Sequence, residues 1–456
     1  MLWKRAAILV ASAALFFLYF FGLTRTGLLG PDEPRYAAIG QAMAQTGDWV
    51  TPRLWGDPWF EKPALLYWMT AAGFKAGLDE DLAPRLPVAV LSVAFLIYFF
   101  LALRQEFGER AAFYATVILA TSAGWLAYSH ISVPDLPMSA AFAAAMLLVM
   151  RESNTKRNAC IAGLLLGIAI LAKGLVPLAL FIPAIWFLRR RIKDLLVVFV
   201  VAAAIAAPWY ILATMRNGLP FLEELFWKHH FGRFFTPELQ HERPFWFFIP
   251  VLAAGLFPWT PLALLLFWKR LYRDHRTAFL LAWFVFGFVL FSASRNKLPG
   301  YLLPLIPPVA ALIGVAIAEA PARAGKVVFP VALSAALLWF IPAIHDLLPQ
   351  ALLSGMSHVQ FRLPLSWVLP ALLVTLCCAL LARNGRVDWA LGLVAVLITA
   401  SVVRMIWQVY PQLDNSVSAR ARWKSSSKSI ICLGDETRSW HYGLNYYARR
   451  HLPDCD

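Results

Sequence analysis

Long apolar blocks alternate with short polar segments along almost the whole chain. The blocks run for roughly 15–22 residues, the length that a helix needs to cross about 30 Å of hydrocarbon. Because hydrocarbon offers no partners to backbone polar groups, such blocks predict an all-α polytopic bundle of membrane helices. We expect about thirteen spans, at residues 6–23, 83–103, 111–129, 136–150, 159–172, 175–188, 195–212, 245–267, 277–292, 300–319, 327–344, 365–382 and 389–407.

The first block, at residues 6–23, follows Lys4 and Arg5 and so has the layout of a signal peptide as well as that of a span. No small-residue cleavage site precedes Thr24, and twelve more apolar blocks follow. We therefore expect an uncleaved first span.

The apolar block at 159–188 allows two interpretations. A single long helix would put Arg189–Arg191 on the opposite side of the membrane from Arg151. A hairpin of two short helices, broken near Lys173, keeps both basic clusters on one side. Because basic residues gather on the cytoplasmic side, the sequence favours the hairpin.

The composition excludes an ordinary soluble domain. Hydrophobic residues make up 60% of the 456 positions and charged residues only 15%, whereas soluble domains carry about 25% charged residues. The net charge of +15 would suit a nucleic-acid binder, but in a membrane protein basic residues mark cytoplasmic loops and anionic lipid headgroups. We expect membrane lipids as partners and no nucleic acid.

Charge also orients the thirteen-span bundle. With the N-terminus inside, the cytoplasmic segments hold 19 of the 41 Lys and Arg residues but only 7 of the 26 Asp and Glu residues. The opposite face holds the other 22 basic and 19 acidic residues. This asymmetry is the positive-inside pattern, and it predicts a bacterial inner-membrane protein whose acidic face is periplasmic.

The predicted periplasmic face also carries the larger loops, at 24–82, 213–244 and 345–364, and a tail from about 410. Since most acidic residues, histidines and loop aromatics lie there, we expect the chemistry to face the periplasm. The predicted organisation is a transmembrane domain at 1–409 and a short periplasmic tail at 410–456.

The tail contains Cys432 and Cys455, with a predicted strand at 429–433 and a predicted helix near 440–450. An oxidising compartment permits a disulfide between the two cysteines, although the pattern alone does not establish one. The other cysteines fall inside spans and are expected to pack as small apolar residues: Cys160, Cys377 and Cys378.

The first loop contains the most informative polar cluster, Pro31 to Tyr36, directly after the first span. Asp32 has the position of a helix N-cap, because Pro34 follows and residues 36–45 have helical character. A capping carboxylate at the membrane surface can also serve as a base, so this structural interpretation leaves a catalytic role open.

Asp135 lies where the third span ends and the fourth begins. It can simply be solvated or cap the fourth helix. It is also expected at the same depth and face as Asp32, and two carboxylates there suit proton abstraction and acceptor positioning. Lys173 interrupts an apolar block, which costs several kcal/mol unless the ammonium reaches the interface or pairs.

Two further loops carry basic residues near the membrane. The loop at 228–234 contains His230 and Arg233 among aromatics that are typical of an interfacial belt. Adjacent histidines alone indicate a metal only weakly. At the next periplasmic span end, Arg295 and Lys297 run against the usual charge bias. They suit a lipid phosphate, whose departure as a leaving group needs fixed positive charge.

Taken in order, these motifs resemble the bacterial aminoarabinose-transferase-like glycosyltransferases, within the protein O-mannosyltransferase superfamily of GT-C fold. The resemblance runs from the first span to about Pro308. It rests on the sequences at 31–37, 47–49, 60–63, 172–174, 230–234, 243–246 and 297–301, together with the turn at Asp135. Each piece is weak alone, but their order on one membrane face is specific.

The resemblance implies a sugar donor on undecaprenyl or a related polyprenyl phosphate. It implies Asp32 as the principal catalytic carboxylate and Asp135 as a supporting one. The implied donor-phosphate contacts are Lys62, Arg233 and Tyr301, to which the charge pattern adds Arg295 and Lys297. Glu61 and His230 match a pair that can bind a divalent metal ion. Other expected substrate contacts are Glu33, Arg35, Tyr36 and Lys173.

The expected reaction is displacement at the anomeric carbon, with lipid A or another envelope glycolipid as acceptor. The segment after the last span is short for this family, so the resemblance does not fix the acceptor. A protein hydroxyl is the alternative acceptor. A non-catalytic lipid-linked sugar transporter is the alternative class, but it would show repeated halves and charges near mid-bilayer, and the sequence shows neither.

Overall fold

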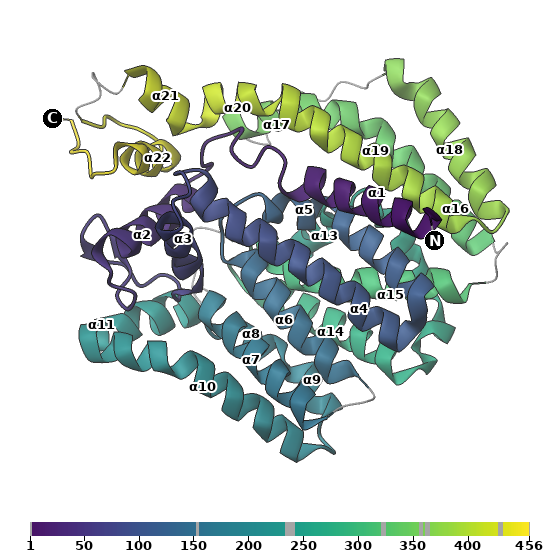
Figure 1. The fold of residues 1–456 in the computed structure, drawn as a ribbon, viewed down its shortest axis with the longest axis horizontal. Helices are drawn as coiled ribbons and strands as arrows, with labels where there is room; N and C mark the ends of the chain where they lie inside the picture. The colour runs from purple at the N-terminus through teal and green to yellow at the C-terminus, as the bar shows by residue number, and fades with distance from the viewer. Residues whose placement is uncertain are drawn as a thin grey trace.

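The computed structural model describes residues 2–151, 155–232, 242–320, 325–354, 359–360, 365–426 and 432–455. Among these residues the fold is helical, apart from one two-stranded antiparallel sheet, β1 (Arg53–Leu54) and β2 (Asp57–Pro58). The expectation of an all-α membrane bundle is therefore confirmed at this level (Figure 1).

Four helices form the centre of the bundle: α4 (Leu82–Thr121), α6 (Asp135–Met150), α7 (Lys156–Lys173) and α15 (Ile306–Glu319). Every residue of α6 after Asp135 is buried, as are residues 306–317 of α15. Small residues explain this close packing, because helices in hydrocarbon associate where side chains let their backbones approach. A Cβ at Gly314 of α15 would lie 2.6 Å from the Ala111 carbonyl oxygen of α4.

The helices around this centre follow the chain in order. The first half comprises α1 (Leu2–Tyr19), α2 (Asp32–Thr46), α3 (Leu65–Lys75), α5 (Ala123–Ser129), α8 (Val176–Leu180), α9 (Ile182–Phe187), α10 (Ile192–Asn217), α11 (Leu219–Leu222) and the π-helix η1 (Glu223–Gly232). The middle comprises η2 (Phe245–Phe247), α13 (Phe248–Leu256), η3 (Thr260–Phe267), η4 (Lys269–Arg273), α14 (His275–Ala293) and η5 (Pro299–Leu305). The last part comprises α16 (Gly325–Ala336), η6 (Leu337–Phe340), α17 (Ile341–Ser354), η8 (Leu365–Trp367), α18 (Val368–Arg383), α19 (Val387–Gln408), α20 (Tyr410–Val417), α21 (Ala419–Ser426) and α22 (Arg438–Ala448).

Within the described residues, seven helices are long and apolar enough to cross a membrane, or eight if one bent pair counts as a span. This finding does not confirm the expected count of thirteen spans. Two expected spans, 83–103 and 111–129, lie on either side of Gly108, whose φ of +86° is not helical and divides α4, and the second span continues into α5. The expected span at 245–267 is broken instead, because its two halves are bent by 115° around Pro258.

The block at 159–188 forms the expected hairpin. Helix α7 ends at Lys173, and Gly174 follows with φ +68°, a conformation that glycine adopts without steric cost. Helices α8 and α9 then lead back along the bundle, and α9 lies against α6 and α14. In Figure 1 the long helix α10 then returns beside α7 to the end of the bundle where α2 and α3 lie.

The first loop and the tail lie side by side at one end of the molecule, at the left of Figure 1, whereas the N-terminus lies toward the right. Helix α22 packs against α2. Within the tail, the predicted helix near 440–450 is confirmed as α22, and Leu433 forms a parallel bridge with Asp454. Residues 429–431 of the predicted strand lie outside the described residues.

Candidate active site

The first loop turns into α2 directly at its acidic residues. Asp32 and Glu33 occupy the first turn, where the helix dipole favours negative charge, and Pro34 needs no hydrogen bond there. The helix ends at Gly47, whose φ is +73°. The N-cap position belongs to Pro31, and no side chain caps the helix. The interpretation of Asp32 as an N-cap is therefore wrong, and its carboxylate is available for other contacts.

Asp32 pairs with the guanidinium of Arg35, one helical turn further on. Arg35 Nη2 lies 2.6 Å from Asp32 Oδ1, with 51% of the Asp32 side chain exposed and only 3% of the Arg35 side chain exposed. The same Nη2 lies 2.9 Å from Glu61 Oε2. Arg35 thus holds one carboxylate at the surface and one inside the loop.

Glu61 is the centre of this inner cluster. Lys62 Nζ lies 3.3 Å from Glu61 Oε1, and the Tyr36 hydroxyl donates to the same oxygen at 3.3 Å. Burial raises the pKa of Tyr36 well above its ordinary value, and the neighbouring Glu61 adds to this. Burial alone would lower the pKa of Arg35, but Glu61, Tyr36 and Asp32 outweigh it and raise the pKa. Tyr36 therefore stays a hydrogen-bond donor and Arg35 stays charged.

A second cluster forms where α6 begins and α7 ends. Lys173 Nζ lies 2.6 Å from Asp135 Oδ1 and 4.9 Å from the centre of the Tyr301 ring. Asp135 is the first residue of α6 and Lys173 is the last of α7, so each charge complements the dipole of its own helix. A Cβ at Gly300 would lie 2.4 Å from Asp135 Oδ1, which explains why glycine precedes Tyr301.

Tyr128, near the end of α5, lies beside the second cluster, because a Cβ at Gly300 would lie 2.7 Å from its hydroxyl. Both Asp135 and Asp32 act electrostatically on its hydroxyl, with Asp135 the stronger influence. Asp135 and Asp32 therefore both lie within electrostatic range of the Tyr128 hydroxyl. Tyr128 was missed from the sequence, where one tyrosine at a span end gives no signal of its own.

Lys297 lies in the connection between α14 and η5. Its Nζ donates to the Arg243 carbonyl oxygen at 3.1 Å and also to the Ser294 carbonyl oxygen. Burial lowers the pKa of Lys297, and Glu242 partly opposes this. Together with the exposed Arg295, these residues line a pocket of about 420 Å³.

Glu33 faces away from Asp32. Both its carboxylate oxygens accept from Arg85, at 2.7 Å each, and they also accept from the backbone N–H groups of Leu29 and Ser132. Arg85 in turn donates to the carbonyl oxygens of Leu23, Thr26 and Gly27. The structure thus places Glu33, expected as a substrate contact, in a buried network that fixes the start of the loop.

Two expected site residues lie outside the described side chains. Arg233 is outside the described residues altogether, and His230 is described only as part of the backbone of η1. Among the described residues, no three His, Cys, Asp or Glu side chains are grouped so that they could hold a metal ion. The described contacts of Glu61 include the cations Arg35 and Lys62 and the Tyr36 hydroxyl.

The chain is similar to known lipid-dependent glycosyltransferases. Residues 61–212 match the family described as dolichyl-phosphate-mannose-protein mannosyltransferase. An undecaprenyl phosphate-alpha-4-amino-4-deoxy-L-arabinose arabinosyl transferase of Pseudomonas fluorescens is 32% identical over 336 residues, 69% of this chain and 57% of the relative. The corresponding arabinosyl transferase of Serratia proteamaculans is 34% identical over 319 residues, which make up 66% of this chain and 57% of the relative. This chain thus spans less than three fifths of either relative's length.

The fold is similar to that of ArnT from Cupriavidus metallidurans. The crystal structure of that protein bound to undecaprenyl phosphate superimposes with a TM-score of 0.76 at 26% identity, covering 98% of this chain and 85% of the other. The apo structure of the same protein gives a TM-score of 0.77, and the superposition covers 99% of this chain and 86% of the other. The likeness therefore includes the tail as well as the membrane bundle.

Proposed function

This chain belongs to the aminoarabinose-transferase-like glycosyltransferases of the protein O-mannosyltransferase superfamily, and from that premise we propose that it transfers a sugar from a polyprenyl phosphate. Undecaprenyl phosphate is the proposed carrier, because it is bound in the similar Cupriavidus structure and named in the relatives. The proposed acceptor is lipid A or another glycolipid on the periplasmic side of the inner membrane.

One observation carries this proposal. Two clusters of paired opposite charges, Asp32–Arg35–Glu61–Lys62 and Asp135–Lys173, lie where helices begin or end, and one carboxylate of each acts electrostatically on Tyr128. A donor with its phosphate at the membrane surface and its tail in the bilayer would present its sugar at this level. The exposed half of Asp32 is the part of the first cluster that a substrate can reach.

The proposed reaction is a displacement at the anomeric carbon. The acceptor oxygen forms a bond to this carbon while the bond to the donor phosphate breaks, and the electron pair leaves with the phosphate. Negative charge develops on the leaving phosphate, so fixed cations stabilise the transition state more than the ground state. We assign this role to Lys62 and Arg233, with Arg295 and Lys297 at the neighbouring loop, and Tyr301 adds a neutral hydroxyl donor to the phosphate.

The role of Asp32 depends on the acceptor. An attacking hydroxyl loses its proton, and Asp32 takes that proton as general base. An attacking phosphate oxygen carries no proton, and Asp32 then orients the acceptor or stabilises positive charge on the sugar. In both cases Arg35 holds Asp32 in place, and the Asp135–Lys173 pair supports the acceptor side.

We infer that this chemistry proceeds through the charged side chains. Glu61 and His230 are the pair that the family resemblance connects with a divalent metal. Because the His230 side chain lies outside the described residues, no step is assigned to a metal ion. A protein O-glycosyltransferase would use the same donor side, and the acceptor alone distinguishes it.

The catalytic assignment is tested with purified protein and a polyprenyl-phosphate sugar. We expect Asp32→Asn to lower transfer at least about 100-fold, the usual contribution of a positioned acid or base. Asp57→Asn, which changes an exposed carboxylate of the same loop, is the matched control and should keep wild-type activity. Full activity of a folded Asp32→Asn variant would remove Asp32 from the catalytic centre.

A further inference from the structure

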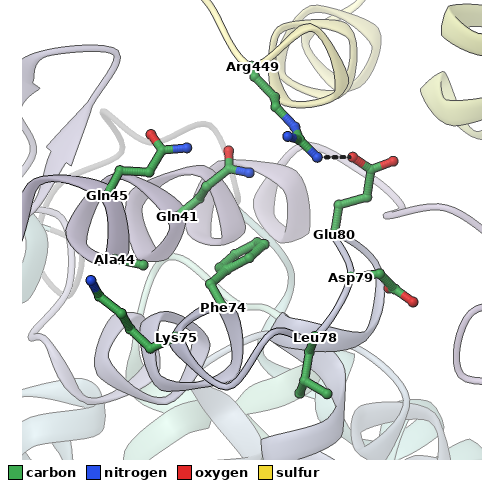
Figure 2. Close-up of a pocket in the computed structure, with 9 residues that line it drawn as sticks. All are labelled: Gln41, Ala44, Gln45, Phe74, Lys75, Leu78, Asp79, Glu80 and Arg449. Carbon is green, nitrogen blue, oxygen red and sulfur yellow. Dashed lines mark hydrogen bonds and ion pairs between the residues drawn. The ribbon is translucent and has the colours of Figure 1, made fainter.

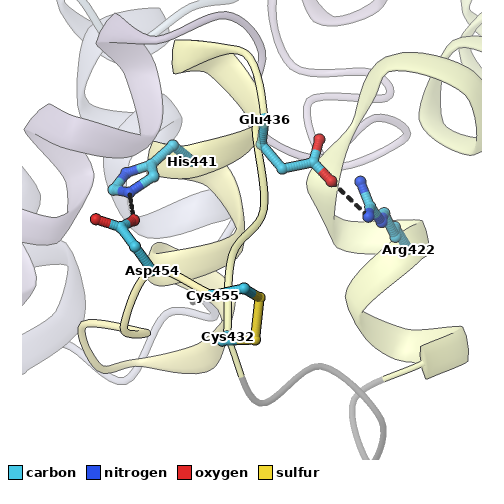
Figure 3. Close-up of a disulfide and its surroundings, with 6 residues drawn as sticks. All are labelled: Arg422, Cys432, Glu436, His441, Asp454 and Cys455. Atoms are coloured by element: carbon cyan, nitrogen blue, oxygen red, sulfur yellow. Dashed lines mark ion pairs between the residues drawn. A yellow bond between two sulfur atoms is a disulfide. The ribbon is translucent and has the colours of Figure 1, made fainter.

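The tail is closed on itself by a disulfide and backbone bonds. Cys432 and Cys455 form a disulfide across 23 positions of the sequence (Figure 3). The Cys455 N–H donates to the Leu433 carbonyl oxygen at 2.7 Å, and the Leu433 N–H donates to the Pro453 carbonyl oxygen at 2.8 Å. Both ends of the segment that contains α22 are therefore tied together.

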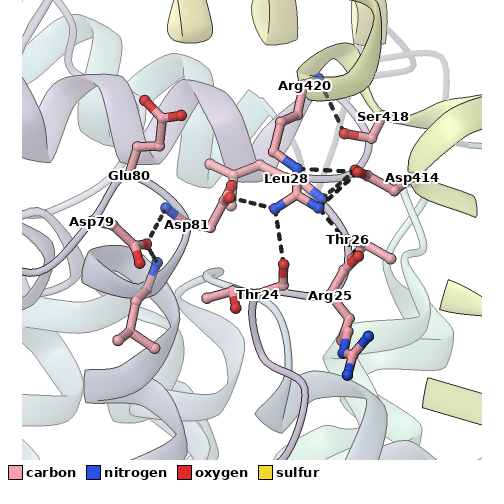
Figure 4. A network of polar contacts seen from close by, with 12 residues as sticks. Thr24, Arg25, Thr26, Leu28, Asp79, Glu80, Asp81, Asp414, Ser418 and Arg420 are labelled. Carbon is pink, nitrogen blue, oxygen red and sulfur yellow. Dashed lines mark hydrogen bonds and ion pairs between the residues drawn. The ribbon is translucent and has the colours of Figure 1, made fainter. Parts of the chain in front are cut away.

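Arg420 docks this tail on the first loop. Its guanidinium lies 2.5 Å from Asp81 and 2.7 Å from Asp414, and it donates to the Thr24 carbonyl oxygen at 2.8 Å (Figure 4). Asp414 in turn accepts from the Gly27 N–H at 2.7 Å. A salt bridge buried in this way orders both partners, because an unpaired charge there would be costly.

Two tyrosines of α22 complete the docking. The Tyr447 hydroxyl donates to Asp81 Oδ1 and accepts from the Leu28 N–H, each at 2.7 Å. The Tyr446 hydroxyl donates to the Glu80 carbonyl oxygen at 2.6 Å, and Arg449 lies 3.3 Å from the Glu80 carboxylate (Figure 2). The tail thus contacts both ends of the first loop, at Leu28, shortly before Asp32, and at Glu80 and Asp81.

The close fit at this junction requires a glycine. A Cβ at Gly27 would lie 2.2 Å from Ser418 Oγ, 2.6 Å from the Tyr447 hydroxyl and 2.7 Å from Arg420 Cβ. The loop and the tail therefore approach each other more closely than any larger residue would allow. The tail has a defined position on the loop.

This docking brings Tyr442 of α22 against the Arg35 guanidinium. The carbon of the guanidinium lies 5.3 Å from the Tyr442 ring centre, 5.1 Å from that of Tyr36 and 5.6 Å from that of Trp59. Tyr442 also stacks on Trp55 at 5.6 Å with an angle of 21° between the rings. Aromatic faces attract a guanidinium, and the attraction grows when the pair is desolvated.

We propose that Tyr442 is a positioning residue of the active site, contributed by the disulfide-closed tail. It closes the aromatic wall around Arg35 and so fixes the guanidinium that holds both Asp32 and Glu61. This proposal rests on the proposed function, because Asp32 is catalytic only there. Tyr442 itself touches neither Asp32 nor a reacting atom in the contacts described.

The test measures kcat and KM for sugar transfer in the full-length protein. We expect Tyr442→Ala to lower kcat about tenfold, the scale of one desolvated cation–π contact, with little change in KM. Tyr442→Phe keeps the ring and should restore kcat. Trp440→Ala is the matched control, because Trp440 lies on the same helix but contacts Arg422.

Wild-type kcat in Tyr442→Ala, or an equal loss in Trp440→Ala, would overturn the proposal. If the melting temperature of Tyr442→Ala falls, Tyr442→Leu keeps an apolar side chain of similar size and the same comparison applies. The Asp32→Asn variant distinguishes a failure of the role proposed for Tyr442 from a failure of the proposed function. An inactive Asp32→Asn beside a fully active Tyr442→Ala contradicts the role of Tyr442 alone, whereas a wild-type protein without transfer activity contradicts the proposed function.

Discussion

At the scale of single residues, two adjacent carboxylates of α2 have opposite environments. Asp32 is half exposed and touches Arg35, whereas Glu33 is 1% exposed and engages Arg85 through both oxygens. The helical turn separates their directions by about 100°. Catalysis needs a carboxylate that substrate can reach, and loop architecture needs one that is fully paired. The exposure of Asp32 therefore suits the catalytic role proposed for it, whereas the paired Glu33 fixes the start of the loop.

The Asp135–Lys173 pair allows a prediction about stability. Lys173→Met leaves Asp135 largely buried beside an apolar side chain, and we expect a loss of about 3 kcal/mol, as when one partner of a buried ion pair is removed. The double variant Asp135→Asn with Lys173→Met should regain most of this loss but stay impaired in transfer. Thermal unfolding of the four proteins of this cycle measures the coupling. Additive losses would show that the two charges do not stabilise each other.

Sequence patterns predicted many of the charged side chains at this site, but not which residues they contact. Lys173 was predicted to reach the interface or to pair, because an isolated ammonium in an apolar block is costly. Its partner, 38 positions away, depends on how α6 and α7 pack. Tyr128, Arg85 and Tyr442 were missed for the same reason, since each acts only through contacts that the tertiary fold creates.

At the scale of elements, apolar block length located the helices but not their breaks. The expected hairpin at 159–188 is present, because Lys173 and Gly174 mark its turn. The bend after Leu256 was not expected, although Pro258 and Pro261 provide a local signal for it. The mean hydropathy of a window of residues is little changed by two prolines. It therefore predicts one span where the chain forms two short helices.

The tail allows a prediction at this scale. We expect the double variant Cys432→Ser with Cys455→Ser to loosen the segment 432–455. The disulfide restricts the unfolded segment, and for a loop of this size this stabilises the folded state by about 3 kcal/mol. Hydrogen exchange of the α22 amides should become faster, while exchange in α6 stays unchanged. Reductant should have the same effect on the wild-type protein and none on the variant. Unchanged exchange in α22 would mean that docking contacts alone hold the tail.

At the scale of the whole molecule, the long polar segments gather at one end of the bundle. The first loop packs against α22, and the start of α1 lies toward the opposite end (Figure 1). Charge asymmetry along the sequence predicts that the first-loop end is periplasmic. Tyr447 and Asp81, which join the tail to the loop, are 366 positions apart, so their contact could not be deduced from local patterns.

Cysteine accessibility tests this orientation. Single cysteines at positions 57 and 295, both exposed in the first-loop and Lys297 regions, should react with an impermeant reagent added to the periplasmic side. A cysteine at position 270 in η4 should react only after the inner membrane is opened. Labelling of position 57 from the cytoplasmic side alone would reverse the predicted topology.

The most direct measurement is mass spectrometry of lipid A and other envelope glycans in cells that lack this protein. The account predicts that one sugar disappears from a periplasmic glycolipid while the polyprenyl-phosphate form of that sugar accumulates. Restoring the wild-type chain should reverse both changes, and restoring Asp32→Asn should reverse neither. Unchanged envelope glycans without accumulation of a polyprenyl-phosphate sugar would contradict the central claim.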